Sequence, residues 1–324
     1  MIQIKLDPLG PFSLDASTEF LRGFTPANYR RLSCAGGSVA ALSDDGALSL
    51  AFTDDRSWQT VAVSVRQRVD GTLQADVAGD ADPTVVHHQL ARILSVDVDG
   101  TGFDQLAGRD RVLARLIRRY PGLRPVCFNS PYEAACWAII GQRLRITQAS
   151  AMRSRISEEY GPEILLGDHR LRAFPAPQTL LKLTHIQGLP EIKLRRLHAI
   201  AGAALDGILD ASALRAVDPL EAMSRLQTLP GIGPFSASLI IIRGAGAPDC
   251  FPAEERRLHD SMAAAYSLTK PSVEDLAQIA QVWRPYRSWA AVLFRVDRER
   301  TTGEIARGRR VTVTPAQPLV EVAR

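Results

Sequence analysis

The hydrophobic pattern of this 324-residue chain changes its period partway along, and that change constrains the fold more than any other feature. Between residues 47 and 77, short apolar and β-branched runs are separated by Asp70-Gly71 and preceded by Asp45-Gly46, both typical hairpin turns. From Asp82-Pro83 onward apolar residues recur at helical spacing, and strand patterns nearly vanish after residue 105. The sequence therefore predicts an α+β chain with a small antiparallel sheet first and helices after it.

Individual segments can be assigned from the same patterns. Strands are expected at 47–52, 60–65 and 73–77, accompanied by one or two helices. Ser130-Pro131-Tyr132-Glu133 has the cap, the proline and the acid of a helix start, and Ser272 with Asp275 forms a second N-cap signature. Further helices are expected near 145–160, 177–184, 191–206, 219–227, 234–243, 254–266, 272–283 and 287–298. We expect an N-terminal sheet domain over 1–104, an all-helical domain with two lobes over 105–300, and a tail over 301–324.

Composition excludes several classes of protein. Hydrophobic residues make up 46% and charged residues 23% of the chain, as in folded globular proteins. No apolar run approaches the roughly 18 residues of a membrane span, and the first residues show no secretory signal pattern. Cys34, Cys127, Cys136 and Cys250 are scattered, which argues against disulfides and an iron–sulfur cluster. We expect a cytoplasmic protein with no membrane partner, and its net charge of +4 permits a polyanionic one.

The most informative motif is Leu229-Pro230-Gly231-Ile232-Gly233-Pro234-Phe235-Ser236-Ala237. Two glycines allow a tight turn and close approach of a partner, and the amides of the helix beginning at Pro234 favour an anion. This pattern is typical of a helix-hairpin-helix that binds a nucleic-acid phosphate through Leu229, Gly231, Ile232, Gly233 and Ser236. The alternative is a tight corner between helices that binds nothing.

Carboxylates follow in Glu254-Glu255-Arg256-Arg257-Leu258, where a loop leads into a helix. Acids at a helix start are usually there because they complement the helix dipole. The apolar stripe that begins at Leu258 passes closer to Glu255 than to Glu254, and Asp260 points nearly opposite. We therefore expect Glu255 to face a cleft between the lobes, with Glu254 as the second candidate acid.

The run from 229 to 258 resembles the helix-hairpin-helix DNA glycosylases, in particular the bacterial 3-methyladenine DNA glycosylase II (AlkA-like) subfamily. The resemblance covers about residues 105–300, and the N-terminal sheet agrees in type and order with the TBP-like domain of that subfamily. Supporting segments are 132–160, 174–178 with Lys193, 283–290 and 121–124.

The resemblance implies a monofunctional DNA glycosylase of base excision repair, monomeric and nucleoid-associated, that flips an alkylated base out of double-stranded DNA into a cleft. Glu255 matches the family's catalytic carboxylate, which stabilises positive charge at the sugar C1′ as the N-glycosidic bond breaks. Phe235 stands where strand-nicking relatives carry a lysine, so no lyase activity is expected. No cofactor is needed for the chemistry; a structural Na⁺ or K⁺ would be held by the carbonyls of Gln227, Leu229 and Ile232.

This chain departs from the family pattern at three places. The family's catalytic acid is an aspartate and here it is a glutamate. The base pocket is implied to contain Phe235, Leu239, Arg256 and Arg295, with arginines where aromatic rings are usual. Arg143 replaces the apolar wedge that fills the gap left by a flipped base; it either stacks there or is a surface arginine. The neighbouring Gln142 is expected, with Arg143, to contact DNA.

These departures leave alternatives to the glycosylase hypothesis. One is a catalytically impaired relative that binds DNA or senses damage, and another is a helical protein with no nucleic-acid role. Among the remaining aromatic residues, Trp137, Trp283 and Trp289 fall at core-like helical positions and are predicted to serve packing, as His259 is predicted to be structural.

Overall fold

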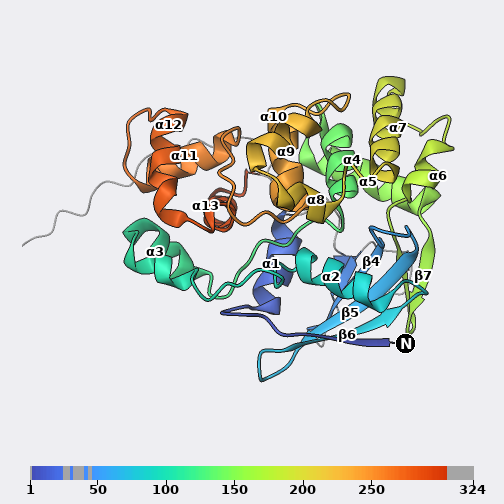
Figure 1. Cartoon of the computed structure of the whole chain (residues 1–324), viewed down its shortest axis with the longest axis horizontal. Helices are drawn as coiled ribbons and strands as arrows, with labels where there is room; N and C mark the ends of the chain where they lie inside the picture. The colour runs from blue at the N-terminus through green and yellow to red at the C-terminus, as the bar shows by residue number, and fades with distance from the viewer. Residues whose placement is uncertain (1, 25–29, 32–39, 43–45, 305–324) are drawn as a thin grey trace, which may run out of the picture.

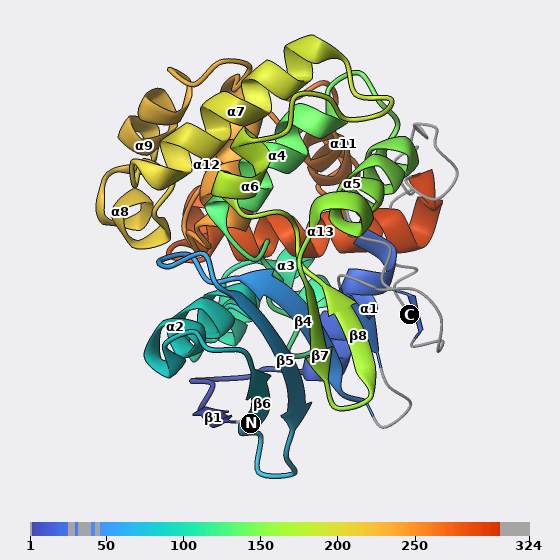
Figure 2. The same cartoon turned by 90° about the vertical axis from the view of Figure 1, so that its right-hand side faces the viewer.

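The computed structural model describes residues 2–24, 30–31, 40–42 and 46–304. It is an α+β structure in which a sheet lies against a larger group of helices (Figure 1; Figure 2). Cys34 and residues 305–324 of the predicted tail lie outside the described residues. No helix within the described part of the chain is long and apolar enough to cross a membrane.

A six-stranded sheet is built from the N-terminal residues, in the order β1-β6-β5-β4-β3-β2. Its strands are β1 (Ile2–Leu6), β2 (Arg30–Arg31), β3 (Ala40–Leu42), β4 (Leu48–Thr53), β5 (Thr60–Gln67) and β6 (Leu73–Ala78). The strands predicted from the sequence correspond to β4, β5 and β6. Neighbouring strands are antiparallel as expected, except that β2 and β3 pair parallel.

Both faces of this sheet are covered, which explains why every residue of β4 is buried. Large side chains such as Leu50 and Val63 pack into the same core as α1 (Leu14–Phe24) and α2 (Pro83–Ile93). The opposite face carries Ala51 and Ala62, which pack against a hairpin of β7 (Glu163–Leu166) and β8 (His169–Arg172). The sequence did not predict this hairpin, since strand patterns nearly vanish after residue 105; it forms because small alanines leave room for a second layer.

The helices otherwise follow the predicted segments. They are α4 (Pro131–Gly141), α5 (Ile146–Tyr160), α6 (Pro177–Leu181), α7 (Glu191–Leu205), α9 (Pro219–Leu226), α10 (Pro234–Leu239) with a π turn at Ile240–Gly244, α11 (Arg256–Ala265), α12 (Val273–Ile279) with a 3₁₀ turn at Ala280–Trp283, and α13 (Arg287–Thr302). The 3₁₀ turn at Asp104–Gly108, α3 (Arg111–Arg119) and α8 (Ala211–Ala216) were not predicted. Ser130 and Ser272 cap α4 and α12 as expected.

Two hydrophobic cores organise the described residues. One joins the sheet and α1–α3 to α11–α13 from the end of the chain, and includes the buried Trp283 and Trp289. The other joins α4–α10. The chain's two ends thus share a core, while its middle forms a second one. Although the predicted tail starts at 301, α13 continues to Thr302 and Glu304 is buried beside Arg298, so residues 301–304 are part of the folded structure.

A buried ion pair links α4 to α5 and gives the first prediction. Arg153 Nη2 lies 2.5 Å from Glu133 Oε2, and the two side chains are 4% and 1% exposed. Glu133→Ala would leave a buried guanidinium without this partner and should lower the free energy of unfolding by about 3–5 kcal/mol. Chemical denaturation measures the change. The control is Glu158→Ala on the exposed face of α5, which should change the free energy of unfolding by less than ~0.5 kcal/mol. Similar losses in both variants would contradict a stabilising role for the buried ion pair.

Candidate active site

Glu255 is the N-cap residue of α11, directly before the first helical residue. Its Oε1 accepts the backbone N–H of Arg257 at 3.1 Å, and its own N–H donates to the carbonyl of Pro252. The capping bond satisfies one of the amides that a helix start leaves open, and it fixes the side chain. The carboxylate, 22% exposed, is therefore held at one position rather than moving freely at the surface.

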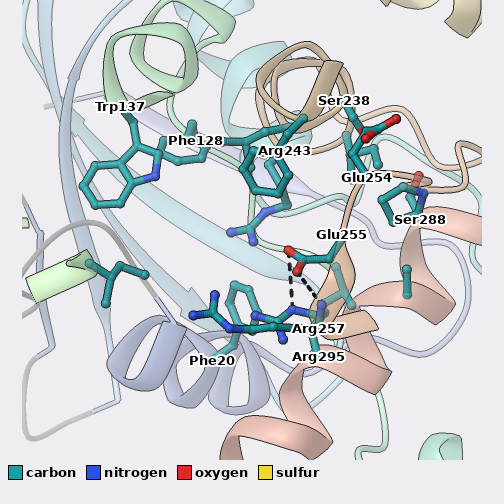
Figure 3. A pocket seen from close by; sticks show the side chains of 17 residues that line it. Phe20, Phe128, Trp137, Ser238, Arg243, Glu254, Glu255, Arg257, Ser288 and Arg295 are labelled. Atoms are coloured by element: carbon teal, nitrogen blue, oxygen red, sulfur yellow. Dashed lines mark hydrogen bonds and ion pairs between the residues drawn. The ribbon is translucent and has the colours of Figure 1, made fainter. Parts of the chain in front are cut away.

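A cavity of about 200 Å³ opens beside this carboxylate (Figure 3). Aromatic rings from three segments form much of its wall: Phe20 from α1, Phe128 just before α4 with Trp137 inside that helix, and Phe235 from α10. The other lining residues are Ile146, Ser238, Leu239, Ile242, Arg243, Pro252, Glu254, Glu255, Arg257, Ser288, Ala291, Val292 and Arg295. Both hydrophobic cores contribute elements, so the cavity lies where the two cores meet.

Arg295 on α13 faces Glu255 across this cavity. Its Nε lies 3.7 Å from Glu255 Oε2, and its side chain is only 14% exposed. Burial lowers the pKa of the Arg295 guanidinium, and the attraction of Glu255 works against that shift. Arginine nevertheless stays protonated in proteins, so the pair is ionic.

Arg243 approaches Glu255 from the other side of the cavity (Figure 3). Its Nε donates to the Val126 carbonyl at 3.0 Å. The guanidinium carbon lies 4.8 Å from the ring centre of Phe20 and 6.0 Å from that of Phe128. Two of the cavity's rings therefore already hold a cation that belongs to the protein.

The structure brings most of the predicted pocket residues together. Glu255, Phe235, Leu239 and Arg295 all line the cavity, and so does the second candidate acid, Glu254. Arg256 does not line it; its side chain is exposed, and Arg257 reaches the cavity in its place. Because Glu255 is the N-cap, the helix begins at Arg256, and this fixes the direction in which each following side chain points from the helix axis.

Trp137 also differs from its predicted role. It is half-buried and lines the cavity, whereas Trp283 and Trp289 are buried as packing residues. Phe20, Phe128, Arg243 and Arg257 were not identified from the sequence. Helical spacing places Trp137 near an apolar face, but only the tertiary structure decides whether that face meets a core or a cavity.

The predicted hairpin is present between α9 and α10. Gly231 adopts a φ of +88°, and a Cβ there would lie 2.7 Å from Arg196 Cδ and 2.9 Å from Ile139 Cδ1. Its carbonyl accepts the side-chain amide of Gln142 at 2.7 Å, and Gln142 Oε1 in turn accepts Arg196 Nη1 at 2.6 Å. Gly231 is therefore required by the fold, and it couples the hairpin to the turn after α4.

A groove of about 830 Å³ runs along the hairpin and this turn. It contains five of the predicted DNA-contact residues, but neither Leu229 nor Ser236 lines it. The lining residues are Gln142, Arg143, Leu144, Pro190, Ile192, Lys193, Arg196, Gly231, Ile232 and Gly233. Arg143 is exposed here with a φ of +58°, while Gly233 caps α10 with ordinary backbone angles and open space where a Cβ would be.

Lys193 has a supporting position under the groove. Its Nζ donates to the carbonyls of Ile140 and Gln142 at 2.8 and 2.7 Å. Burial lowers the pKa of Lys193, and the nearby Arg196 adds to this. The ammonium therefore holds the turn that presents Arg143, and its bonds point inward.

The expected cation ligands can be tested against the chemistry of their donors. Gln227, Leu229 and Ile232 would offer backbone carbonyls, which suit a hard monovalent cation. The Leu229 carbonyl accepts the Ile232 N–H at 3.0 Å and keeps a second lone pair. No group of three or more histidine, cysteine or acidic side chains that could hold a metal occurs among the described residues.

The fold and hairpin are those of a helix-hairpin-helix protein, and comparison with known proteins shows which proteins the chain resembles. DNA-3-methyladenine glycosylase 2 of Escherichia coli is 29% identical over 252 residues, 72% of this chain and 86% of that protein. DNA-3-methyladenine glycosylase of Bacillus subtilis is 27% identical over 201 residues, 60% of this chain and 66% of that protein. The match thus spans just under two thirds of the Bacillus protein.

A solved structure supports the fold over nearly the whole chain. The 3-methyladenine DNA glycosylase of Archaeoglobus fulgidus superposes with a TM-score of 0.72 at 20% identity, covering 93% of this chain and 100% of that one. No family model matches the sequence. The solved structure shows that the chain shares this fold, and the sequence relatives show that it resembles the AlkA-like helix-hairpin-helix DNA glycosylases.

The two hairpin glycines should respond differently to alanine. Gly231→Ala meets both a left-handed backbone and close side chains, and should lower the free energy of unfolding by about 1–3 kcal/mol. Gly233→Ala should leave stability within ~1 kcal/mol, because its backbone angles suit alanine and its Cβ meets open space.

DNA binding separates the hairpin's two interpretations. If a phosphate approaches Gly233, the added methyl should weaken duplex binding severalfold in a protein of unchanged stability. Fluorescence anisotropy with an undamaged duplex measures this. Unchanged affinity in Gly233→Ala would favour the alternative of a helix corner that binds nothing.

Proposed function

We propose that this protein is a monofunctional DNA glycosylase that excises alkylated bases from double-stranded DNA in base excision repair. The observation that carries the proposal is Glu255, a capped carboxylate facing an aromatic cavity of about 200 Å³. The names of the sequence relatives, DNA-3-methyladenine glycosylases, support the substrate class. A base flipped out of the duplex would enter the cavity.

In this mechanism Glu255 acts at the sugar. The capping bond from Arg257 holds Oε1, so the carboxylate can stabilise positive charge developing at C1′ without first reorganising. The same carboxylate can orient a water for attack on C1′ and accept its proton. Phe235 stands where a strand-nicking relative needs a lysine, which supports hydrolysis without a Schiff-base step.

The groove beside the hairpin is proposed as the DNA interface. It places Arg143 and Arg196 on one surface with Gly233, so two cations would meet the backbone that the hairpin binds. Leu229 and Ser236, although outside the groove lining, flank the turn and remain proposed contacts. A Na⁺ or K⁺ on the carbonyls of Gln227, Leu229 and Ile232 would add charge at the same place.

The remaining finer features are proposals of the same kind. They are a TBP-like N-terminal sheet domain over 1–104, two helical lobes over 105–300 with the cavity between them, a monomer, and a cytoplasmic, nucleoid-associated location. The arrangement of two hydrophobic cores supports the lobes, since the cavity lies where they meet.

One observation favours a second candidate, a relative that binds DNA or senses damage and cuts poorly. Arg295 lies 3.7 Å from the carboxylate that would do the chemistry. A guanidinium so close offsets part of the negative charge that would stabilise C1′. The glutamate's extra methylene also displaces the carboxylate relative to an aspartate, and a misplacement of about 1 Å can cost 10²-fold in rate.

Base release separates the two candidates. Duplexes carrying a methylated purine or 1,N⁶-ethenoadenine should lose the base in the presence of the protein, and Glu255→Gln should lower the rate by about 10²–10⁴-fold. Glu254→Gln should lower it far less, because that acid lies at the exposed edge of the cavity. Chromatography of the released base gives the rate.

The controls decide the outcome. Duplex binding by Glu255→Gln should persist, showing that only the chemistry is lost. No release by the unsubstituted protein, with duplex binding retained, would favour the sensing candidate. Release gained in Glu255→Asp would then show that the scaffold had only lost the position of its acid.

A further inference from the structure

The aromatic rings of the cavity are not all available to a bound base. A ring attracts a cationic base through its face, and here the Arg243 guanidinium carbon already lies 4.8 Å from the ring centre of Phe20 and 6.0 Å from that of Phe128. Arg243 is fixed in that place by its bond to the Val126 carbonyl. Two of the aromatic rings that could bind a cationic base are thus already paired with a cation of the protein itself.

The net charge of the cavity also disfavours a cationic base. Arg243, Arg257 and Arg295 line it together with the acids Glu254 and Glu255, which gives a small excess of positive charge in about 200 Å³. Glu255 is also engaged by Arg295 at 3.7 Å. A second positive charge brought into this space would be repelled, whereas a group that accepts hydrogen bonds would meet guanidinium donors.

Building on the proposed glycosylase function, we propose that the cavity selects uncharged alkylated purines that carry a ring-nitrogen or oxygen acceptor, in preference to the positively charged N-methylated purines. 1,N⁶-Ethenoadenine represents the first class and 7-methylguanine the second. Arg257 and Arg295 are the specificity-determining residues, because both guanidiniums line the cavity beside Glu255.

The charge that the base carries as the N-glycosidic bond breaks gives Arg257 and Arg295 a role in the reaction. The bond from C1′ to the base nitrogen breaks with its electron pair going to the base, and the oxygen of water forms the new bond to C1′. The water proton passes to Glu255 and from there to the departing base when that base is uncharged in DNA, or to solvent when the base is cationic. A cationic base leaves as a neutral molecule, but an uncharged base leaves with negative charge, which guanidinium donors stabilise in the transition state.

The experiment compares two duplexes that differ only in the damaged base, one with 1,N⁶-ethenoadenine and one with 7-methylguanine. The measured quantity is the acceleration of base release over the spontaneous rate, because a cationic base is intrinsically labile. We expect the acceleration for the ethenoadenine duplex to exceed that for the methylguanine duplex by about tenfold or more, and binding of the two duplexes to follow the same order.

Substitution of Arg257 tests the cause. Its side chain is 41% exposed and meets Glu304 only at 4.0 Å, so Arg257→Gln should fold normally. Removing this charge should shift the ratio of accelerations toward 7-methylguanine by about fivefold. Arg256→Gln is the matched control, because it removes the same charge from the same helix at an exposed residue outside the cavity, and it should leave the ratio unchanged.

Each outcome decides between the two proposals. Equal or greater acceleration for 7-methylguanine would overturn the selectivity and leave the glycosylase function standing. An identical shift in both arginine variants would show a long-range charge effect and would also overturn it. If neither base is released, the proposed function fails; the selectivity then depends on binding, where a preference for the ethenoadenine duplex supports it and equal affinity overturns it.

Discussion

The shared hydrophobic core of the chain's two ends is the constraint on which the candidate site depends. Trp283 and Phe294 from the last helices pack in one cluster with Leu50 and Val63 of the sheet. That cluster fixes α11 and α13 relative to α1, and so determines where Glu255 and Arg295 stand with respect to Phe20. Dense interiors of this kind allow few alternative arrangements. Phe20, which is far from Glu255 along the chain, therefore supplies part of the cavity wall.

The second core supplies the rest of the wall and the hairpin. Trp137 and Phe235 reach the cavity from α4 and α10, which pack together in that core. The hydrogen bonds from Arg196 to Gln142 and from Gln142 to Gly231 then tie the turn after α4 to the hairpin. The helices and turns of the second core thus line the whole of the groove and one side of the cavity.

Sequence reasoning succeeded where the signal is local. Ser130 caps α4 because its hydroxyl, the following proline and Glu133 are adjacent in the chain, and β4–β6 follow from alternation between turns. It failed where distant segments decide. Phe20 and Arg243 reach the cavity through tertiary packing, and the β7–β8 hairpin forms because Ala51 and Ala62 leave room for it. The sequence predicted Arg256 in the cavity, but Arg257 lines it instead. This error arises because neighbouring residues of a helix point about 100° apart and the first helical residue is uncertain by one or two positions.

Under the proposed function, Glu255 and Arg295 form one coupled departure from the aspartate and the aromatic ring that the resemblance implies. A glutamate's extra methylene carries the carboxylate further from the backbone, and its N-cap bond to Arg257 limits where the group can go. Arg295 Nε on α13 lies 3.7 Å from Glu255 Oε2, and both side chains are largely buried. The attraction between the two charges offsets part of the free-energy cost of removing each of them from water. Replacing only one of them would leave a poorly compensated charge. The same pairing puts guanidinium donors where the resemblance implies a ring face, which is why the proposed preference for an uncharged base and the longer acid would arise together.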